Sequence, residues 1–476
     1  MQIRSVKENT VLNIIRVVCS MIFPLITFPY ISRTIGPANY GKVNYCASIV
    51  SYFVLVATFG ISDYASREGA RIRDNRQRLN RFCSEVFSIN LYVSVIVSLV
   101  YVVFVFGGRQ FENYKVLLLI QGIQLMILPF NIEWFYTVFE DFRYITVRSI
   151  AVQVISLLLL ICLVRKADDY YIYAAITVLS GCGASVFNFL YARKFMKIKP
   201  TIHTNIRTHL RPMMILLGHS IALTIYVASD TTMLGVFCGD YEVGIYSAAT
   251  RIYLIVKQLL NAMIMVSIPR LSNCIGRADS KSYNHLLNNI FTWLYTLVLP
   301  CVVGLFCLGK EVMVLIGGSE YIQSGAPLKI LSISLIFAVF ACFFTQAILL
   351  PNQKEKYILY GSVASAAVNL ILNFWMIPHY TYIGAAVTTV IAEGVIFGMS
   401  YIFSKKYGKV HLNRNVLPVL VGCCMIFIWC IVCKKIFNNN LIIVASSILG
   451  SGVFYLITLI IGKHPVICEI RNHSFL

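Results

Sequence analysis

The sequence predicts an all-α integral membrane protein with about 14 transmembrane helices, and three observations support this fold class. Hydrophobic residues make up 58% of the 476 residues, whereas charged residues make up only 13%, about half the share found in soluble domains. The apolar residues fall in runs of about 20, the length that a helix needs to cross a bilayer. The polar gaps between the runs are short, which excludes a sizeable soluble domain and a disordered chain.

Fourteen apolar runs are the predicted spans. The first six lie near residues 11–32, 43–61, 84–106, 116–138, 144–164 and 171–191. The next six lie near residues 213–234, 243–268, 288–308, 326–350, 357–377 and 383–403, and the last two near 415–433 and 441–461. The first run is too long for the apolar part of a cleavable signal peptide, so we expect it to remain as a membrane helix.

Basic residues predict the orientation of these spans. Lys and Arg total 40 against 20 Asp and Glu, a formal net charge of +20. Every strongly basic gap is even-numbered, and Lys and Arg collect in cytoplasmic loops. Both termini are therefore expected in the cytoplasm. Because the charge is confined to gaps between apolar runs, anionic lipids explain it better than a nucleic acid does.

A glycine pattern suggests an internal repeat. Gly36 and Gly41 follow the first run, and Gly239 and Gly244 follow the seventh at a constant offset of 203. We therefore expect two parallel six-helix lobes around a central cavity, plus two C-terminal helices. The expected domains are residues 1–207 and 208–407 for the lobes, and 408–476 for helices 13 and 14 with a cytoplasmic tail.

Basic residues inside spans are the candidate substrate-binding groups, because charges there are costly. Arg16 lies in the first run, which Pro24 and Pro29 should kink. Its alternative role is to reach back to the cytoplasmic headgroups. Arg251 and Lys257 lie in the eighth run and diverge by roughly 120° around a helix, so only one of them should face a narrow cavity.

Three acidic residues inside spans are candidate coupling or cavity groups: Asp230, Glu133 and Glu393. The alternative for each is a structural ion pair with a basic neighbour. Arg148, near the start of the fifth run, is expected at the membrane interface. No catalytic residue and no metal site is predicted, and the isolated Cys430 and Cys433 are interpreted as packing residues.

Several stretches resemble one known family: residues Asn131–Ile150, Ser229–Leu259, Ser267–Ser272, Tyr382–Gly394 and Phe28–Tyr45. They are similar to the Wzx-like polysaccharide transporter branch of the multidrug/oligosaccharidyl-lipid/polysaccharide exporter superfamily. The resemblance covers almost the whole chain, and the last two helices are the least distinctive. Each motif alone is weakly specific, but together they occur in the family's order and topology.

The resemblance implies a flippase of a bacterial cytoplasmic (inner) membrane. Its substrate would be an undecaprenyl-diphosphate-linked oligosaccharide repeat unit, moved to the outer leaflet for O-antigen, capsule or a related polysaccharide. Transport would use alternating access with a basic cavity and no cofactor, coupled to H⁺, to Na⁺ or to the membrane potential. Partners would include membrane lipids and the polysaccharide polymerase and chain-length machinery, but no nucleic acid.

Two alternatives remain open from sequence. A cation-coupled multidrug antiporter would have the same fold, but a cavity for drug cations should contain more acids than arginines. A membrane-embedded polysaccharide polymerase or ligase would need a large outer loop with catalytic groups. The longest outer gap, Gly309–Gly325, offers only Lys310, Glu311 and Glu320 as charged groups between its apolar flanks.

Overall fold

Helices make up nearly all of the chain in the computed structural model, which describes residues 6–196, 198–201, 206–277, 279–411 and 415–471. No strand occurs within these ranges. The chain divides into two compact units, Met1–Thr232 and Met233–Leu476, which we describe separately. The domain boundaries expected from sequence at residues 207 and 407 stay predictions.

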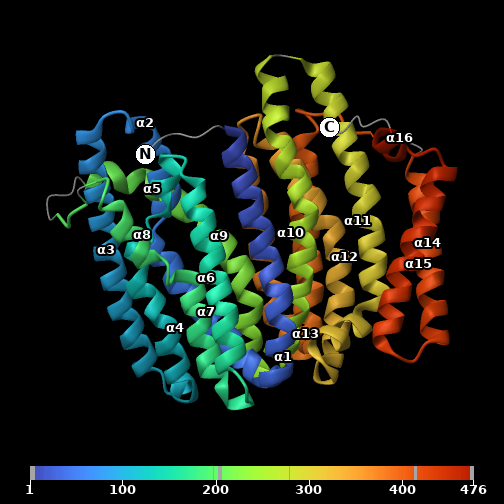
Figure 1. The fold of residues 1–476 in the computed structure, drawn as a ribbon, viewed down its shortest axis with the longest axis horizontal. Helices are drawn as coiled ribbons and strands as arrows, with labels where there is room; N and C mark the ends of the chain where they lie inside the picture. The colour runs from blue at the N-terminus through green and yellow to red at the C-terminus, as the bar shows by residue number, and fades with distance from the viewer. Residues whose placement is uncertain (1–5, 197, 202–205, 278, 412–414, 472–476) are drawn as a thin grey trace. The chain divides into compact units, whose positions relative to one another are not determined.

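The described residues of the first unit form nine helices in order (Figure 1). Their bounds are α1 Val6–Thr58, α2 Ile61–Ile72, α3 Arg76–Gly107, α4 Lys115–Ile127, α5 Glu133–Val138, α6 Phe142–Leu163, α7 Tyr170–Cys182, α8 Ser185–Ala192 and α9 Ile206–Phe237. Short 3₁₀ turns connect them at η1 Arg109–Tyr114, η2 Leu128–Phe130 and η3 Ala167–Asp169. The last five residues of α9 belong to the second unit.

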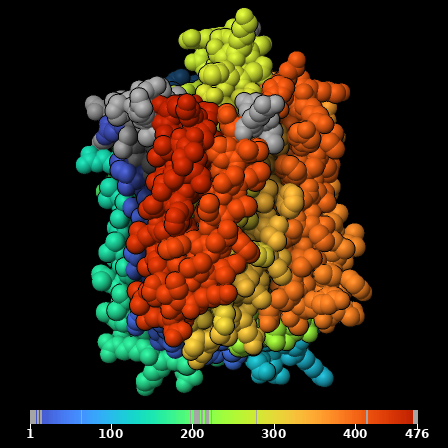
Figure 2. Space-filling model, turned by 90° about the vertical axis from the view of Figure 1, so that its right-hand side faces the viewer, coloured from blue at the N-terminus to red at the C-terminus, as the bar shows by residue number. Residues whose placement is uncertain are grey.

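The second unit begins within α9 and continues to the end of the chain. Its further helices are α10 Asp240–Gly276, α11 Ser280–Gly317, α12 Gly325–Cys342, α13 Glu355–Ser404, α14 Val416–Ile436, α15 Asn440–Ile461 and α16 Pro465–Arg471. A 3₁₀ turn, η4 Ser319–Ser324, precedes α12, and a π-helical turn, η5 Phe343–Leu349, follows it. Figure 2 shows α14 and α15 side by side on the surface of this unit, and both also contact α11.

The helices correspond to the predicted spans in order. Eleven segments of the described chain are long and apolar enough to cross a membrane. α1, with a break in helical backbone geometry at Gly36, and α13, with one at Thr381, each cover two predicted spans. α9 covers the seventh predicted span. The chain is thus an all-α, multi-pass membrane protein, as predicted, and the orientation of its termini stays a prediction.

The glycine repeat marks equivalent breaks between helices. Gly36 has φ 71° and divides α1, and Gly239 has φ 107° immediately before α10. Both values lie in the region that glycine adopts readily and other residues avoid. The sequence repeat therefore reflects a backbone requirement at two matching positions.

Side-chain hydrogen bonds extend the repeat. In the first unit, Ser84 Oγ accepts from the backbone N–H of Lys199 (3.3 Å), and Ser88 Oγ accepts from that of Thr201 (2.8 Å). The extended segment 198–201 is thereby fixed along α3.

The second unit repeats this arrangement on α11. Asn284 Oδ1 accepts from the backbone N–H of Lys409 (3.0 Å), and Asn288 Oδ1 accepts from that of His411 (2.9 Å). In both units the acceptors are four residues apart and the donors two apart. One ridge of a helix therefore holds the segment that follows the sixth helix of each predicted set.

The short C-terminal helix α16 is held against α11 by a polar and an aromatic contact. Trp293 Nε1 donates to Glu469 Oε2 at 2.7 Å. His464, immediately before α16, is fully buried and packs edge-on against Tyr295, with 6.1 Å between the ring centroids. Burial lowers the pKa of His464, because a buried imidazole loses the hydration that stabilises its charged form.

We predict that mild acid loosens α16. A histidine whose pKa is lowered by folding stabilises the folded state fully above its unfolded pKa of about 6.5 and loses that contribution as the pH falls below it. Backbone hydrogen exchange in residues 465–471, corrected for intrinsic rates, should therefore be faster at about pH 5.5 than at about pH 7.5. His464→Asn keeps an acceptor for the Val466 N–H and cannot titrate, so its exchange should not depend on pH. Equal pH dependence in both proteins would contradict the prediction.

Candidate functional site

Three charged side chains from distant parts of the chain meet in the first unit. Arg16 Nη1 lies 2.6 Å from Glu133 Oε1, and Arg148 Nη2 lies 3.2 Å from Glu133 Oε2. The exposed fractions of the side chains are 31% for Arg16, 33% for Glu133 and 14% for Arg148. One carboxylate is therefore bound at both oxygens by two guanidinium groups, and the cluster has a net charge of about +1 at neutral pH.

Local backbone features position these side chains. Pro129 lies in the 3₁₀ turn η2, which interrupts the helical path before Glu133, the first residue of α5. Acidic residues are favoured in the first turn of a helix by the unpaired backbone N–H groups. Arg148 follows the first residue of α6 by six positions, about 9 Å along the helix axis. α6 is joined to α1 by a hydrogen bond from Thr146 Oγ1 to the Leu12 carbonyl (3.1 Å).

Arg148 keeps hydrogen-bonding capacity that Glu133 does not use. Its Nε and Nη1 atoms are buried and have no hydrogen-bond partner among the described residues. Buried polar groups usually find partners, and guanidinium groups bind carboxylates and phosphates with short charge-assisted hydrogen bonds. The cluster therefore has the charge and the spare donors to accept a further anion.

The structure gives Arg148 a partner that sequence did not predict. Its side chain pairs with Glu133, and its expected position at the membrane interface stays a prediction. The chain reverses between α5 and α6 at Glu140, which has φ 56°. This reversal brings residue 148 back beside residue 133. The acidic residue inside a span was the available signal, because such a group needs a basic partner.

The second unit contains a buried pair formed by two of the predicted site residues. Lys257 Nζ lies 2.5 Å from Glu393 Oε1, and the Tyr253 hydroxyl donates to the same oxygen at 3.3 Å. Ser334 Oγ is 3.0 Å from the Tyr253 hydroxyl. Lys257 was expected to bind substrate and Glu393 to be a coupling or cavity acid. In the structure the two charges compensate each other, and their functional roles stay predictions.

Arg251 lies apart from this pair. It is exposed on α10, and it forms no hydrogen bond or ion pair with any residue that the structure describes. Its divergence from Lys257 around α10 agrees with the spacing argued from sequence. Its role in substrate binding stays a prediction.

Asp230 lies in a polar part of α9 within the first unit. It is 6% exposed. Two residues further on, Thr232 Oγ1 lies 2.8 Å from Ser48 Oγ and 3.2 Å from the Tyr52 hydroxyl on α1. Polar residues from α1 and α9 therefore meet at the level of Asp230, whose coupling role also stays a prediction. Among the described residues, no group of three or more His, Cys, Asp or Glu side chains could hold a metal ion.

Comparisons with known proteins add to this geometry. A family model described as "Polysaccharide biosynthesis protein" matches residues 6–275, and one described as "MatE" matches residues 216–375. The chain is 22% identical to a protein of Escherichia coli named "Putative O-antigen transporter", with 84% of this chain and 96% of the relative covered. It is 23% identical to the "Capsular polysaccharide biosynthesis protein CapF" of Staphylococcus aureus, with 83% of this chain and 97% of the relative covered.

Solved structures have the same fold. The lipid II flippase MurJ, in an inward closed conformation, matches with a TM-score of 0.79 at 16% identity, with 96% of this chain and 100% of that chain covered. An inward-facing multidrug resistance MATE family transporter matches with a TM-score of 0.60 at 13% identity, with 83% and 98% covered.

We predict that Glu133→Gln destabilises the first unit. The amide cannot compensate two guanidinium groups, so the free energy of unfolding should fall by about 1–3 kcal/mol. Glu140→Gln is the matched control, because among the described residues Glu140 pairs with Arg73 alone, at 3.2 Å, and both side chains are 34% exposed. Such a pair contributes about 0–1 kcal/mol. The measurement is thermal unfolding of the detergent-solubilised protein, and equal melting temperatures for the two variants would contradict the prediction.

Proposed function

The chain belongs to the polysaccharide biosynthesis protein family, and from this membership we propose that it is a flippase for lipid-linked oligosaccharides. The family match confirms the resemblance noted in the sequence. The proposed substrate is an undecaprenyl-diphosphate-linked repeat unit, moved from the cytoplasmic to the outer leaflet of a bacterial cytoplasmic membrane. The product would be assembled into O-antigen, capsule or a related surface polysaccharide. The names of the Escherichia coli and Staphylococcus aureus relatives support this substrate class.

The observation that carries the proposal is the cluster of Arg16, Glu133 and Arg148. A diphosphate with sugars cannot cross hydrocarbon unaided, because each unpaired polar group there costs several kcal/mol. The cluster lies within spans and has unused buried donors on Arg148. A diphosphate has two or more negative charges, against one on Glu133, and it can therefore compete with the carboxylate for both guanidinium groups.

An apolar groove in the second unit offers a place for the lipid chain. It has a volume of about 370 Å³ and lies between α10, α11, α14 and α15. Its lining is almost entirely apolar and includes Leu305, Ile426, Ile448 and Tyr455. An isoprenoid chain is apolar along its whole length, so it gains from burial in such a groove. In the proposal, this groove of the second unit holds part of the lipid.

A multidrug antiporter is the second candidate, favoured by the MatE match over residues 216–375. A cationic drug would be repelled by the net positive cluster around Glu133, whereas a diphosphate is attracted. We therefore propose a transporter of an anionic lipid-linked substrate, without enzymatic activity. Coupling to H⁺, to Na⁺ or to the membrane potential, and contacts with polymerase and chain-length machinery, belong to the same proposal.

The proposed function is tested by deleting the protein and analysing lipid-linked repeat units. Without the flippase, these units should accumulate on the cytoplasmic leaflet while their synthesis continues. Absence of the lipid-linked unit from the deletion strain would mean that the protein acts in synthesis, and the proposal would fail.

Substitutions of Arg16 and Arg148 test whether the basic cluster binds the diphosphate, and export is measured for each variant. Arg16→Ala and Arg148→Ala should stop export, because losing one charge-assisted contact in a partly dry site costs on the order of 2–5 kcal/mol. That is roughly 30-fold to several thousand-fold in affinity. Lys at either position should restore export only partly, since it lacks the planar guanidinium group that forms two parallel hydrogen bonds. Glu at either position should reduce export more than Ala does. We expect Arg251→Ala to reduce export as well, as predicted from sequence.

The control for these variants is Arg73→Ala, which removes one half-buried pair with Glu140 outside the cluster, beside a basic loop, and should be nearly silent. Surface polysaccharide is measured per unit of membrane-inserted protein. Wild-type export by Arg16→Glu and Arg148→Glu would eliminate the basic cluster as the diphosphate site.

Filling the groove should block the lipid without harming the fold. Gly304 and Gly452 line the groove, and a Cβ at either position meets no atom within 4 Å. Gly304→Leu and Gly452→Leu are therefore expected to be stably inserted and to reduce export. Gly181→Leu on α7 in the first unit is the control, because its Cβ also meets open space. Export equal to that of Gly181→Leu in both groove variants would contradict the proposed position of the lipid chain.

A further inference from the structure

A chain of buried hydrogen bonds in the first unit lies outside the cluster around Glu133. The Tyr64 hydroxyl lies 2.7 Å from His209 Nδ1, and His209 Nε2 lies 2.9 Å from Glu85 Oε2. Glu85 Oε1 accepts from Arg81 Nε at 2.9 Å. Tyr64, Glu85 and His209 are 4%, 6% and 6% exposed, whereas the Arg81 side chain is 75% exposed. Three helices, α2, α3 and α9, are joined through one imidazole.

The two hydrogen-bond partners of His209 determine which ring nitrogen carries the hydrogen in the neutral imidazole. The carboxylate of Glu85 only accepts hydrogen bonds, so His209 Nε2 must carry a hydrogen. His209 Nδ1 is then an acceptor, and the Tyr64 hydroxyl donates to it. Burial raises the pKa of the Tyr64 phenol, so the hydroxyl keeps its proton across the physiological range. Every donor and acceptor in this arrangement is satisfied.

A proton on His209 Nδ1 changes this pattern. Both ring nitrogens then donate, so the Tyr64 oxygen must accept from Nδ1–H. The hydroxyl hydrogen of Tyr64 loses its acceptor in a site that is almost fully buried. A buried donor without a partner is costly, and the structure must relax where Tyr64 and α2 meet His209.

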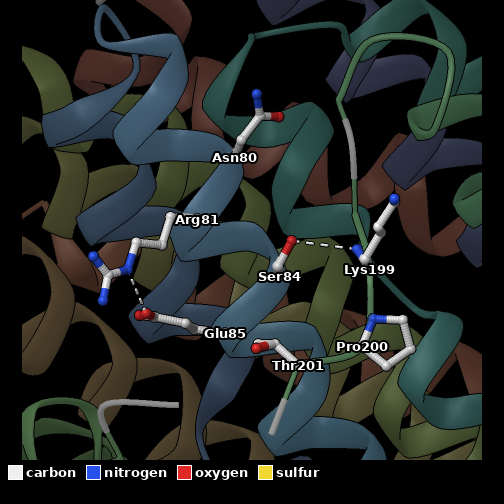
Figure 3. Close-up of a pocket in the computed structure, with 7 residues that line it drawn as sticks. All are labelled: Asn80, Arg81, Ser84, Glu85, Lys199, Pro200 and Thr201. Atoms are coloured by element: carbon white, nitrogen blue, oxygen red, sulfur yellow. Dashed lines mark hydrogen bonds and ion pairs between the residues drawn. The ribbon is translucent and has the colours of Figure 1, made fainter. Parts of the chain in front are cut away.

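A pocket connects this series of hydrogen bonds to the surface. It has a volume of about 570 Å³, and its lining includes Arg81, Ser84 and Glu85 from α3 and Lys199 and Thr201 from the following extended segment. Figure 3 shows the Arg81 guanidinium directed at the Glu85 carboxylate, and Ser84 directed at the backbone of Lys199. Arg81 lies in the second gap, just before the third predicted span, and Lys199 and Thr201 lie in the sixth gap. Both gaps are predicted to be cytoplasmic, so protons would arrive from that side.

Some of the charges around the imidazole favour a positive charge on the ring, and others oppose it. Glu85 on α3 favours a positive charge on the ring, and Arg81 beside it opposes one. On α2, Glu68 and Arg67 act with opposite sign on the Tyr64 hydroxyl. The amino end of α9 opposes a positive charge. The uncharged ring of Phe82, from α3, packs against the imidazole, and Trp134 from α5 packs against Phe82.

We propose that His209, held between Glu85 and Tyr64, is a proton-binding site that communicates with the cytoplasm through the pocket beside Glu85 and controls the attachment of α2 to α9. The neutral imidazole holds Tyr64, and the protonated imidazole releases it. Histidine is the side chain that ordinarily changes charge between about pH 5 and pH 8. The site deepens the proposed function by giving the transporter a proton-sensitive element, but its existence does not depend on the substrate.

Hydrogen exchange in the full-length detergent-solubilised protein tests this site. In the wild type, exchange in residues 61–72, corrected for intrinsic rates, should rise between about pH 7.5 and about pH 5.5. His209→Gln reproduces the neutral pattern, with an amide N–H for Glu85 and a carbonyl for Tyr64, so this rise should be lost. His285→Gln is the matched control, because His285 is exposed and contacts only Asn289 among polar partners of the described chain; it should keep the rise.

A second measurement needs no variant. Exchange of the histidine C2 hydrogen, followed by mass spectrometry of the wild type, reports directly whether His209 takes up a proton. A change in this exchange over the same pH range as the rise in α2 supports the proposal. Absence of that change, absence of the wild-type rise in α2, or persistence of that rise in His209→Gln would overturn it. Because neither readout involves transport, failure of the flippase proposal is distinguishable from failure of this one.

Discussion

The hydrocarbon interior of a membrane offers no partner to a charged group, so a buried charge in a span must be compensated within the protein. Glu133 does this for Arg16 and Arg148, and Glu393 does it for Lys257. Both arrangements join segments more than 100 residues apart in sequence. The ion pairs therefore fix how helices lie against each other within each unit, while the apolar surface can tolerate many arrangements.

The two units meet this constraint differently. In the second unit, one lysine faces one glutamate, and a tyrosine and a serine complete the hydrogen bonds. Such a balanced pair is suited to holding helices together. In the first unit two guanidinium groups share one carboxylate, and donors of Arg148 remain unused. An excess of positive charge with spare donors has a cost in stability that a bound anion can offset, which is why we place the diphosphate there and not at Lys257.

The sequence was sufficient to predict the features that depend on helix length and on backbone conformation. The apolar runs coincide with helices because the thickness of the bilayer sets their length, and Gly36 and Gly239 both mark breaks that need a positive φ. Sequence was insufficient for contacts that depend on packing. It identified Glu133 and Arg16 separately, but it could not predict that the reversal at Glu140 returns Arg148 to Glu133. His209 was missed because it precedes the apolar run of α9 and resembles a loop residue.

The shared carboxylate also constrains the coupling of transport. In the proposed mechanism the diphosphate displaces Glu133 from Arg16 and Arg148, which leaves a carboxylate without a cation inside a span. A cation bound at that carboxylate would compensate its charge. Substrate binding and cation uptake are then linked at one residue, since the free carboxylate and the diphosphate compete for the same guanidinium groups. Membrane potential alone provides no such link, because it acts on total charge and does not neutralise Glu133 at the moment of displacement.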